Sequence, residues 1–235
     1  MIQNPSAPLL KIDQLEGSRF KPLDLEITPG SGVIVHSNDQ QALDEFIDLV
    51  HGLSPRVGGQ VLLFDSDPVE LTNAARIKLC RELAYACSNS SAGLISNLKV
   101  WENIVLPLQA CGLATTPAEL DQLEELMLEA FAVAGFDESW VRANLHESPD
   151  RLTEFQKIIC GLVRCHLTGF RLLLGDCLFR GDDSTRVAEA DAMLNWLGER
   201  HPDSGLLLVH HGRAPVDVLG LSAWKPIEKV SLEAR

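Results

Sequence analysis

The stretch that decides the fold reads LTEFQKIICGLVRCHLTGFRLLLGDCLFRGDD, residues 152–183. Apolar residues recur at intervals of three and four from Thr153 to Leu167, which predicts an amphipathic helix. The continuous apolar run Leu172–Asp176 follows, and Leu206–His210 is a second run of this kind. Such runs are typical of parallel strands that are covered on both faces, and in α/β folds the carboxyl ends of these strands carry the ligand site. We therefore predict an α/β protein.

The rest of the chain supplies further strands and helices. Apolar and polar residues alternate at 9–15 and again at 23–27 before Pro29-Gly30, which predicts an antiparallel pair of strands that ends in a turn. The sequence also predicts strands at 32–35, 61–65 and 84–87 and helices at 72–83, 100–109, 117–134 and 184–196. From about residue 98 to residue 167 the pattern is mostly helical.

Composition narrows the classes of function. The chain has 235 residues, 46% of them hydrophobic, and a net charge of −13. We predict one domain over 1–235. We do not expect a general nucleic-acid-binding surface, because such surfaces are basic and this chain is acidic. The six cysteines form no C-x-x-C pair, which favours a reducing compartment. We see neither a secretory signal nor an apolar run long enough to cross a membrane.

Residues 37–45 lie between the strand at 32–35 and an amphipathic helix, where a phosphate-binding loop is expected. Such a loop needs glycines that let backbone N–H groups reach phosphate, a lysine, and a Ser or Thr for Mg²⁺. At the positions where those phosphate-binding residues would stand, this chain has Ser37, Gln40, Ala42, Leu43, Asp44 and Glu45. Two carboxylates would repel a triphosphate. We predict instead that Ser37, Asn38 or Asp39 caps the helix with a side-chain oxygen.

Taken in order, these segments resemble the nucleotide-binding subunit of an ATP-binding-cassette (ABC) transporter, from about Leu9 to Trp224, with Mla-type lipid-transport ATPases as the most similar group. The resemblance rests on Leu152–Gln156 (signature loop), Val163-Arg164, Leu172–Gly175, Asp176–Phe179, Gly181-Asp182-Asp183, Val100–Ile104 with Pro107-Leu108, and Val209–His211. It implies a P-loop NTPase-like ABC nucleotide-binding domain that has an antiparallel β subdomain and an inserted helical subdomain at about 97–168.

The chain departs from the family pattern at the positions that carry the chemistry. In the resemblance, Leu43 replaces the Walker A lysine and Cys177 replaces the general-base glutamate, and a neutral thiol is a poor base near pH 7. Glu154 and Phe155 replace signature glycines after Thr153, and Ser90 replaces the Q-loop glutamine. The remnants are the Mg²⁺-position Asp176, the D-loop Asp183 and the switch-position His211. These imply no catalytic residue and no bound cofactor.

The resemblance implies a catalytically silent subunit that serves as a structural or regulatory partner in a membrane transport complex, with lipid as the cargo. It would be cytoplasmic and bound at the inner membrane through a permease. Trp101, Glu102 and Asn103 would contact this permease. The subunit could form a homodimer, or a heterodimer with another ABC ATPase. Two alternatives stay open. One is a weak or partner-dependent ATPase that binds ATP and Mg²⁺, and the other is a soluble module that reuses the cleft for another ligand.

A metal site is not expected at His210-His211. Adjacent residues at the end of a strand point in opposite directions, so they rarely share one ion. Cys177 is not expected to be a nucleophile either, because the chain lacks a Cys-His-Asn signature.

Overall fold

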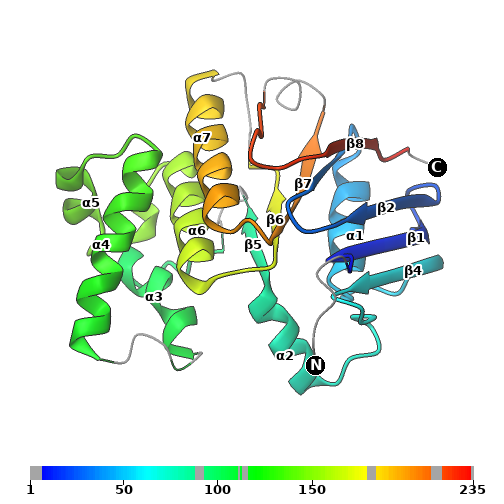
Figure 1. The fold of residues 1–235 in the computed structure, drawn as a ribbon, viewed down its shortest axis with the longest axis horizontal. Coiled ribbons are helices and arrows are strands. Elements are labelled where there is room, and N and C mark those ends of the chain that lie inside the picture. The colour runs from blue at the N-terminus through cyan, green and yellow to red at the C-terminus, as the bar shows by residue number, and fades with distance from the viewer. Residues whose placement is uncertain are drawn as a thin grey trace.

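The computed structural model describes residues 7–87, 93–110, 112, 116–178, 184–212 and 219–233 (Figure 1). The strands are β1 (Leu10–Glu16), β2 (Leu23–Ile27), β3 (Gly32–Ser37), β4 (Gly58–Leu63), β5 (Leu83–Cys87), β6 (Leu172–Asp176), β7 (Gly205–His211) and β8 (Ile227–Ser231). The helices are α1 (Gln40–Val50), α2 (Asn73–Glu82), α3 (Val100–Ala110), α4 (Pro117–Val133), α5 (Glu138–Asn144), α6 (Glu154–Thr168) and α7 (Ser184–Arg200), with a 3₁₀ turn at Pro149–Arg151.

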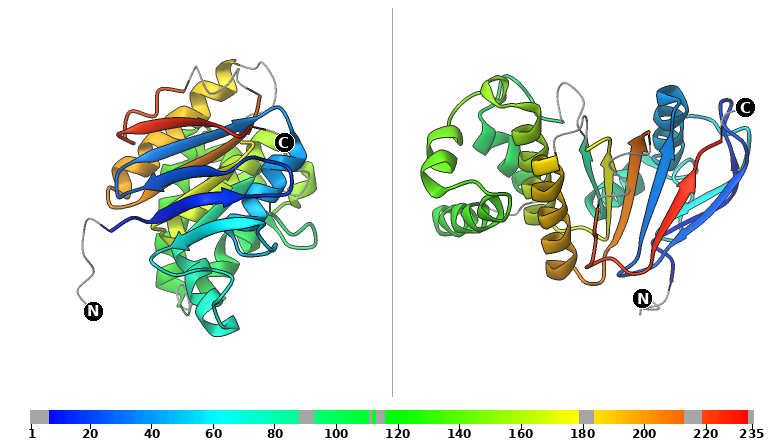
Figure 2. Two further views of the ribbon diagram at one scale, coloured as in Figure 1. Left: turned by 90° about the vertical axis from the view of Figure 1, so that its right-hand side faces the viewer. Right: turned by 90° about the horizontal axis from the view of Figure 1, so that it is seen from above.

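Two sheets form the strand part of the fold. A parallel sheet has the order β5-β6-β7-β3-β8, and a smaller antiparallel sheet has the order β2-β1-β4. Figures 1 and 2 show the antiparallel sheet on one side of the parallel sheet and helices α3 to α7 on the other. The predicted α/β class and the antiparallel pair β1-β2 are confirmed.

The register of the parallel sheet brings distant parts of the sequence to one edge. Ser37 at the end of β3 pairs with His211 at the end of β7, and Asp176 at the end of β6 pairs with both Cys87 and Val209. Because parallel strands end at the same edge, residues from four strands surround the start of α1 there.

Each face of the parallel sheet has its own apolar core. One core lies between the two sheets and includes the α1 side chains Leu43 and Phe46. The larger core joins the other face to helices α3 to α7 and includes the fully buried Trp224. Burial of this apolar surface is the main favourable term that holds the helical region against the sheet.

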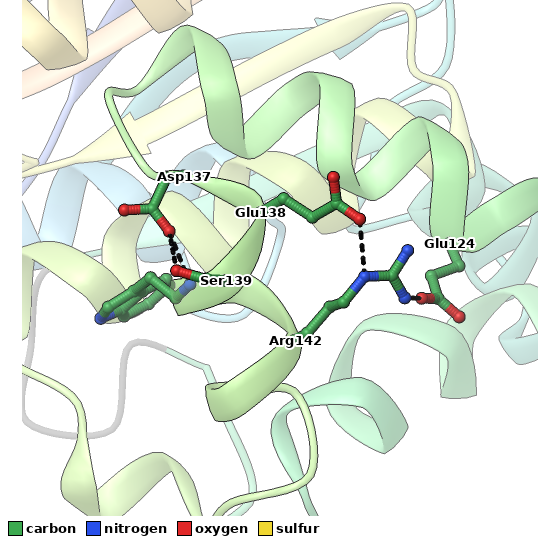
Figure 3. Close-up of polar contacts among 6 residues, drawn as sticks. Glu124, Asp137, Glu138, Ser139 and Arg142 are labelled. Atoms are coloured by element: carbon green, nitrogen blue, oxygen red, sulfur yellow. Dashed lines mark hydrogen bonds and ion pairs between the residues drawn. The ribbon is translucent and has the colours of Figure 1, made fainter.

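Polar contacts fix the short helix α5 within the helical region (Figure 3). Asp137 caps α5 by accepting from the Trp140 N–H at 2.8 Å, and it also accepts from the Ser139 hydroxyl. Arg142 bonds Glu138 on its own helix at 2.8 Å and forms an ion pair with Glu124 on α4. These exposed contacts orient α5 against α4, while burial of Val141 and neighbouring apolar residues supplies most of the stability.

The sequence did not predict α5 or β8. Strand β8 is at the edge of the sheet, pairs only with β3, and has no fully buried residue. A half-exposed edge strand therefore lacks the apolar run that identifies the central strands. Within the described ranges, no helix is both long and apolar enough to cross a membrane.

Candidate functional site

At the start of α1, side chains of the same chain cap the backbone N–H groups. Asp39 is the N-cap, and its Oδ1 accepts from the backbone N–H groups of Gln41 at 2.9 Å and Ala42 at 3.3 Å. The Ser37 Oγ accepts from the Asp39 N–H at 3.1 Å. The predicted cap is confirmed. Two of the N–H groups that a phosphate would need are already satisfied within the chain.

Two side chains of the segment 37–45 point away from the carboxyl edge of the parallel sheet. Leu43 is fully buried in the core between the sheets. Glu45 accepts from the Ser18 N–H and hydroxyl, both at 2.7 Å, and from the Arg19 N–H at 3.0 Å. Burial acts to raise the pKa of Glu45, but these hydrogen bonds outweigh it and lower that pKa. The Glu45 carboxylate therefore holds the loop between β1 and β2.

An open pocket of about 340 Å³ lies at the carboxyl edge of the sheet beside α1. It is lined by Gln40, Asp44, Ile47, Asp48, Tyr85, Asp176 and Cys177. Asp176, on β6, is 8% exposed, and its Oδ2 accepts from the Tyr85 hydroxyl at 2.8 Å. Burial and the charge of Asp176 raise the pKa of Tyr85, so its hydroxyl stays a neutral donor. Gln40, Asp44, Asp176 and Cys177 are candidate residues from the sequence, whereas Asp48 and Tyr85 were not predicted to lie here.

Cys177 is buried and lines the same pocket. It is 3% exposed and adopts a left-handed backbone conformation (φ 47°), with its N–H bonded to the Val209 carbonyl at 2.7 Å. Burial, followed by the charge of Asp176, raises the pKa of its thiol to about 11. The thiol therefore stays protonated at neutral pH, as a poor base and a poor nucleophile.

The two histidines at the end of β7 have different surroundings. His210 is buried, with Nδ1 3.2 Å from the Gly212 carbonyl, while His211 is exposed, with Nε2 3.1 Å from the Asn38 carbonyl. Among the residues that the structure describes, no group of three or more His, Cys, Asp or Glu side chains is placed to hold a metal ion. Asp183 and Ser90 lie outside the described residues.

The start of α6, at the signature position, is also closed by its own side chains. Thr153 Oγ1 accepts from the Gln156 N–H at 3.3 Å, and Gln156 Oε1 accepts from the Thr153 N–H at 2.8 Å. Glu154 pairs with Lys157 at 3.1 Å, and Phe155 stacks on Phe136 with ring centroids 6.3 Å apart. None of these side chains lines the pocket beside α1.

The structure also has a larger, mostly apolar groove of about 580 Å³. Helices α2, α3 and α6 and strand β5 supply its walls, which are Ile77, Arg81, Leu83, Ala84, Tyr85, Pro107, Leu108, Ala110, Arg164, Cys165, Thr168 and Gly169. Ile77 is 61% exposed, although it is a large apolar side chain. A helix face with an exposed apolar residue is the signal that could have identified the groove.

The three residues proposed to contact a partner lie just before the part of α3 that lines this groove. Asn103 is 3% exposed; its Oδ1 accepts from the Ile95 N–H at 2.6 Å, and its Nδ2 donates to the Ile95 and Lys99 carbonyls, each at 3.0 Å. Its amide holds the segment before α3, and its contact with a partner stays a prediction. Glu102 is exposed and accepts from the Lys99 N–H at 2.7 Å. Trp101 is partly buried against the larger core, and its contact with a partner stays a prediction.

The fold is that of an ABC nucleotide-binding domain. The dimeric ABC transporter cassette MJ0796 superposes with a TM-score of 0.73 at 18% identity, over 94% of each chain. The ATP-binding subunit of an ABC transporter gives 0.70 at 17% identity, over 96% of this chain and 88% of that one. CbiO1 from Clostridium perfringens, part of the transporter complex cbiONQ, gives 0.71 at 14% identity, over 96% and 87%. No protein-family model and no curated protein matches the chain. Identities this low establish the fold alone.

Proposed function

We propose that this chain is a nucleotide-independent subunit of a membrane transport complex, built on an ABC cassette fold and retaining its docking surface. The observation that carries the proposal is the start of α1, where Asp39 occupies the amides of Gln41 and Ala42 and Leu43 is buried in the core. A triphosphate would have to displace this cap, without a lysine to neutralise its charge. The capped start of α6 is a second argument in the same direction, because its side chains already satisfy the N–H groups of Thr153 and Gln156, at the position where a partner's nucleotide would be contacted.

Calorimetry with Mg-ATP tests the absence of binding. We expect no heat of binding at nucleotide concentrations up to about 1 mM. Such a result would exclude a free energy of binding more favourable than about −4 kcal/mol. A dissociation constant in the low micromolar range for the isolated chain would overturn the proposal.

Hydrolysis is tested with two variants of Cys177. Turnover should not exceed that of Cys177→Ala, since the protonated thiol supplies no base. Cys177→Glu restores a carboxylate but leaves both helix starts capped, so it should stay inactive. Robust turnover by Cys177→Glu would mean that the loop at 37–45 does bind phosphate.

The groove between α2, α3 and α6 is the proposed docking surface for a permease helix. Its walls are apolar along Ile77, Leu83 and Leu108, and Arg81 and Arg164 also line it, which suits an amphipathic helix with acidic residues. Ile77→Asp should abolish co-purification of a permease subunit. Leu53→Asp is a matched control, since Leu53 is 65% exposed and outside the groove. Equal loss with both variants would remove the groove from the proposal. Lipid as cargo is proposed from the Mla-type resemblance alone.

The second candidate is a transporter ATPase with partner-dependent activity. It is favoured by the comparisons, since the similar structures are transporter cassettes and one was solved bound to ADP and Pi. Retention of Asp176 and His211 at the carboxyl edge also favours it. In this case a second ATPase subunit would supply an intact Walker A. Turnover in a reconstituted heterodimer that is lost in Asp176→Asn, but absent from each subunit alone, would support this candidate.

A further inference from the structure

Two histidines face each other between the neighbouring helices α6 and α7 (Figure 1). His166 lies in the last turn of α6, and His201 directly follows the last residue of α7. The His166 Nδ1 is 3.1 Å from the His201 Nε2, and the planes of the two rings are inclined by 71°. Neither residue lines the pocket beside α1 or the apolar groove, so neither proposed function uses the pair.

Aromatic packing fixes both imidazole rings. His166 packs on Trp196 and His201 packs on Phe170, in each case with ring centroids 4.5 Å apart. The backbone of His201 is also held, because its N–H donates to the Leu197 carbonyl at 2.9 Å. Two ligands that are already held in place lose little conformational freedom when they bind an ion, which favours binding.

The separation of the two facing nitrogens is close to the one that a tetrahedral metal ion requires. With Zn–N bonds of ~2.05 Å and a tetrahedral angle, two imidazole nitrogens on one Zn²⁺ lie ~3.3 Å apart. In the absence of an ion, one proton between the rings satisfies both nitrogens. For an ion to bind, this proton has to move to the outer nitrogen of its own ring. The hydrogens are then on His166 Nε2 and His201 Nδ1, and both facing nitrogens present lone pairs.

The charge and the accessibility of the pair are compatible with a bound cation. Burial lowers the pKa of both histidines, so the rings are neutral near pH 7, which is the form that binds metal ions. Arg200, whose charge acts on His166, forms an ion pair with Glu129. Both histidines are partly exposed, so an ion reaches them from solvent without opening the core.

We propose that His166 Nδ1 and His201 Nε2 together bind a late first-row divalent ion such as Zn²⁺, with water in its remaining positions. Imidazole nitrogen is a preferred ligand of these ions, whereas Mg²⁺ and Ca²⁺ require oxygen ligands. The bound ion links the end of α6 to the end of α7. The inference goes beyond the proposed transport role and does not depend on the docking groove.

The first test is calorimetry on the full chain with ZnCl₂ at about pH 7.5. We expect a dissociation constant below about 0.1 mM for Zn²⁺ and no binding of Mg²⁺. His166→Gln and His201→Gln should each weaken Zn²⁺ binding at least tenfold. His146→Gln is the matched control, since this histidine is exposed and outside the pair, and it should change the affinity less than twofold.

Imidazole NMR on the wild-type chain is a second test that needs no variant. Because Zn²⁺ is diamagnetic, the ring signals stay observable during the titration. The signals of His166 and His201 should shift together and reach a plateau at one ion per chain, while those of His146 should stay unchanged.

Four results would overturn the inference. These are no binding at about 1 mM Zn²⁺, equal binding of Mg²⁺, unchanged affinity in either variant of the pair, which would place the ion on other ligands such as cysteine thiolates, and no shift of the His166 and His201 signals. Thermal unfolding without Zn²⁺ confirms that the variants are folded. Loss of permease docking in Ile77→Asp would leave the Zn²⁺ result unchanged, which separates the two proposals.

Discussion

Acidification should destabilise this protein through a pair of histidines that joins the end of α6 to the end of α7. His166 Nδ1 lies 3.1 Å from His201 Nε2, and the His166 ring packs against Trp196 with centroids 4.5 Å apart. Burial, together with the positive charges of His201 and Arg200, lowers the pKa of His166 from 6.5 to about 4. Burial also lowers the pKa of His201.

The sign follows from proton binding. Between pH 6.5 and about 4 the unfolded chain binds a proton at His166 that the folded chain does not, so the free energy of unfolding falls as the pH falls. At pH 5 the free energy of unfolding is ~2 kcal/mol lower than at neutral pH if the whole of this pKa difference is counted. Because the ring is partly exposed, we halve this to ~1 kcal/mol. For a domain of this size, that corresponds to about 2–4 °C in melting temperature.

The assay compares melting temperatures at about pH 7.5 and pH 5 for three proteins. His166→Gln should lose about 2–4 °C less than the wild type between the two conditions, because it removes the proton-binding difference. His146→Gln, at an exposed histidine, should lose as much as the wild type. Groups that do not contact His166, including His51, titrate in all three proteins and cancel in the comparison. Equal losses in His166→Gln and the wild type would refute the reasoning.

Three further predictions concern stability and assembly. Asp39→Ala removes the cap of α1 and should cost ~1 kcal/mol in chemical denaturation without creating ATP affinity; micromolar ATP binding by this variant would contradict the proposed function. Asn103→Ala leaves the Ile95 amide and neighbouring carbonyls without partners and should cost ~2–3 kcal/mol, whereas a change below ~0.5 kcal/mol would refute its structural role. If the Trp101 ring only packs in the core, Trp101→Ala should lower the melting temperature. If the ring anchors the partner, the same change should weaken permease co-purification at least tenfold. A fully stable variant that assembles normally would exclude both roles.

The sequence predicted the fold better than it predicted the site. The central strands β6 and β7 are identified by their apolar runs because both of their faces are buried. The cap at Asp39 was predictable from local chemistry alone. The different directions of Asp44 and Glu45 were not, because they depend on where the loop at 17–19 passes. Asp48 could have been found, since a residue four positions after Asp44 lies on the same helix face. Tyr85 reaches the pocket only through the pairing of β5 with β6.

The hydrogen bonds of Glu45 to Ser18 and Arg19 affect how readily this chain could change its activity in evolution. In an ordinary loss of function, reverting the altered residues restores the old activity. Under the proposed function, the residue that would have to revert also holds another loop, so replacing Glu45 with serine or threonine would release that loop before any phosphate could bind. The step at Glu45 would therefore pass through a less stable protein. Under the proposed function, selection for folding alone is enough to keep a glutamate at this position.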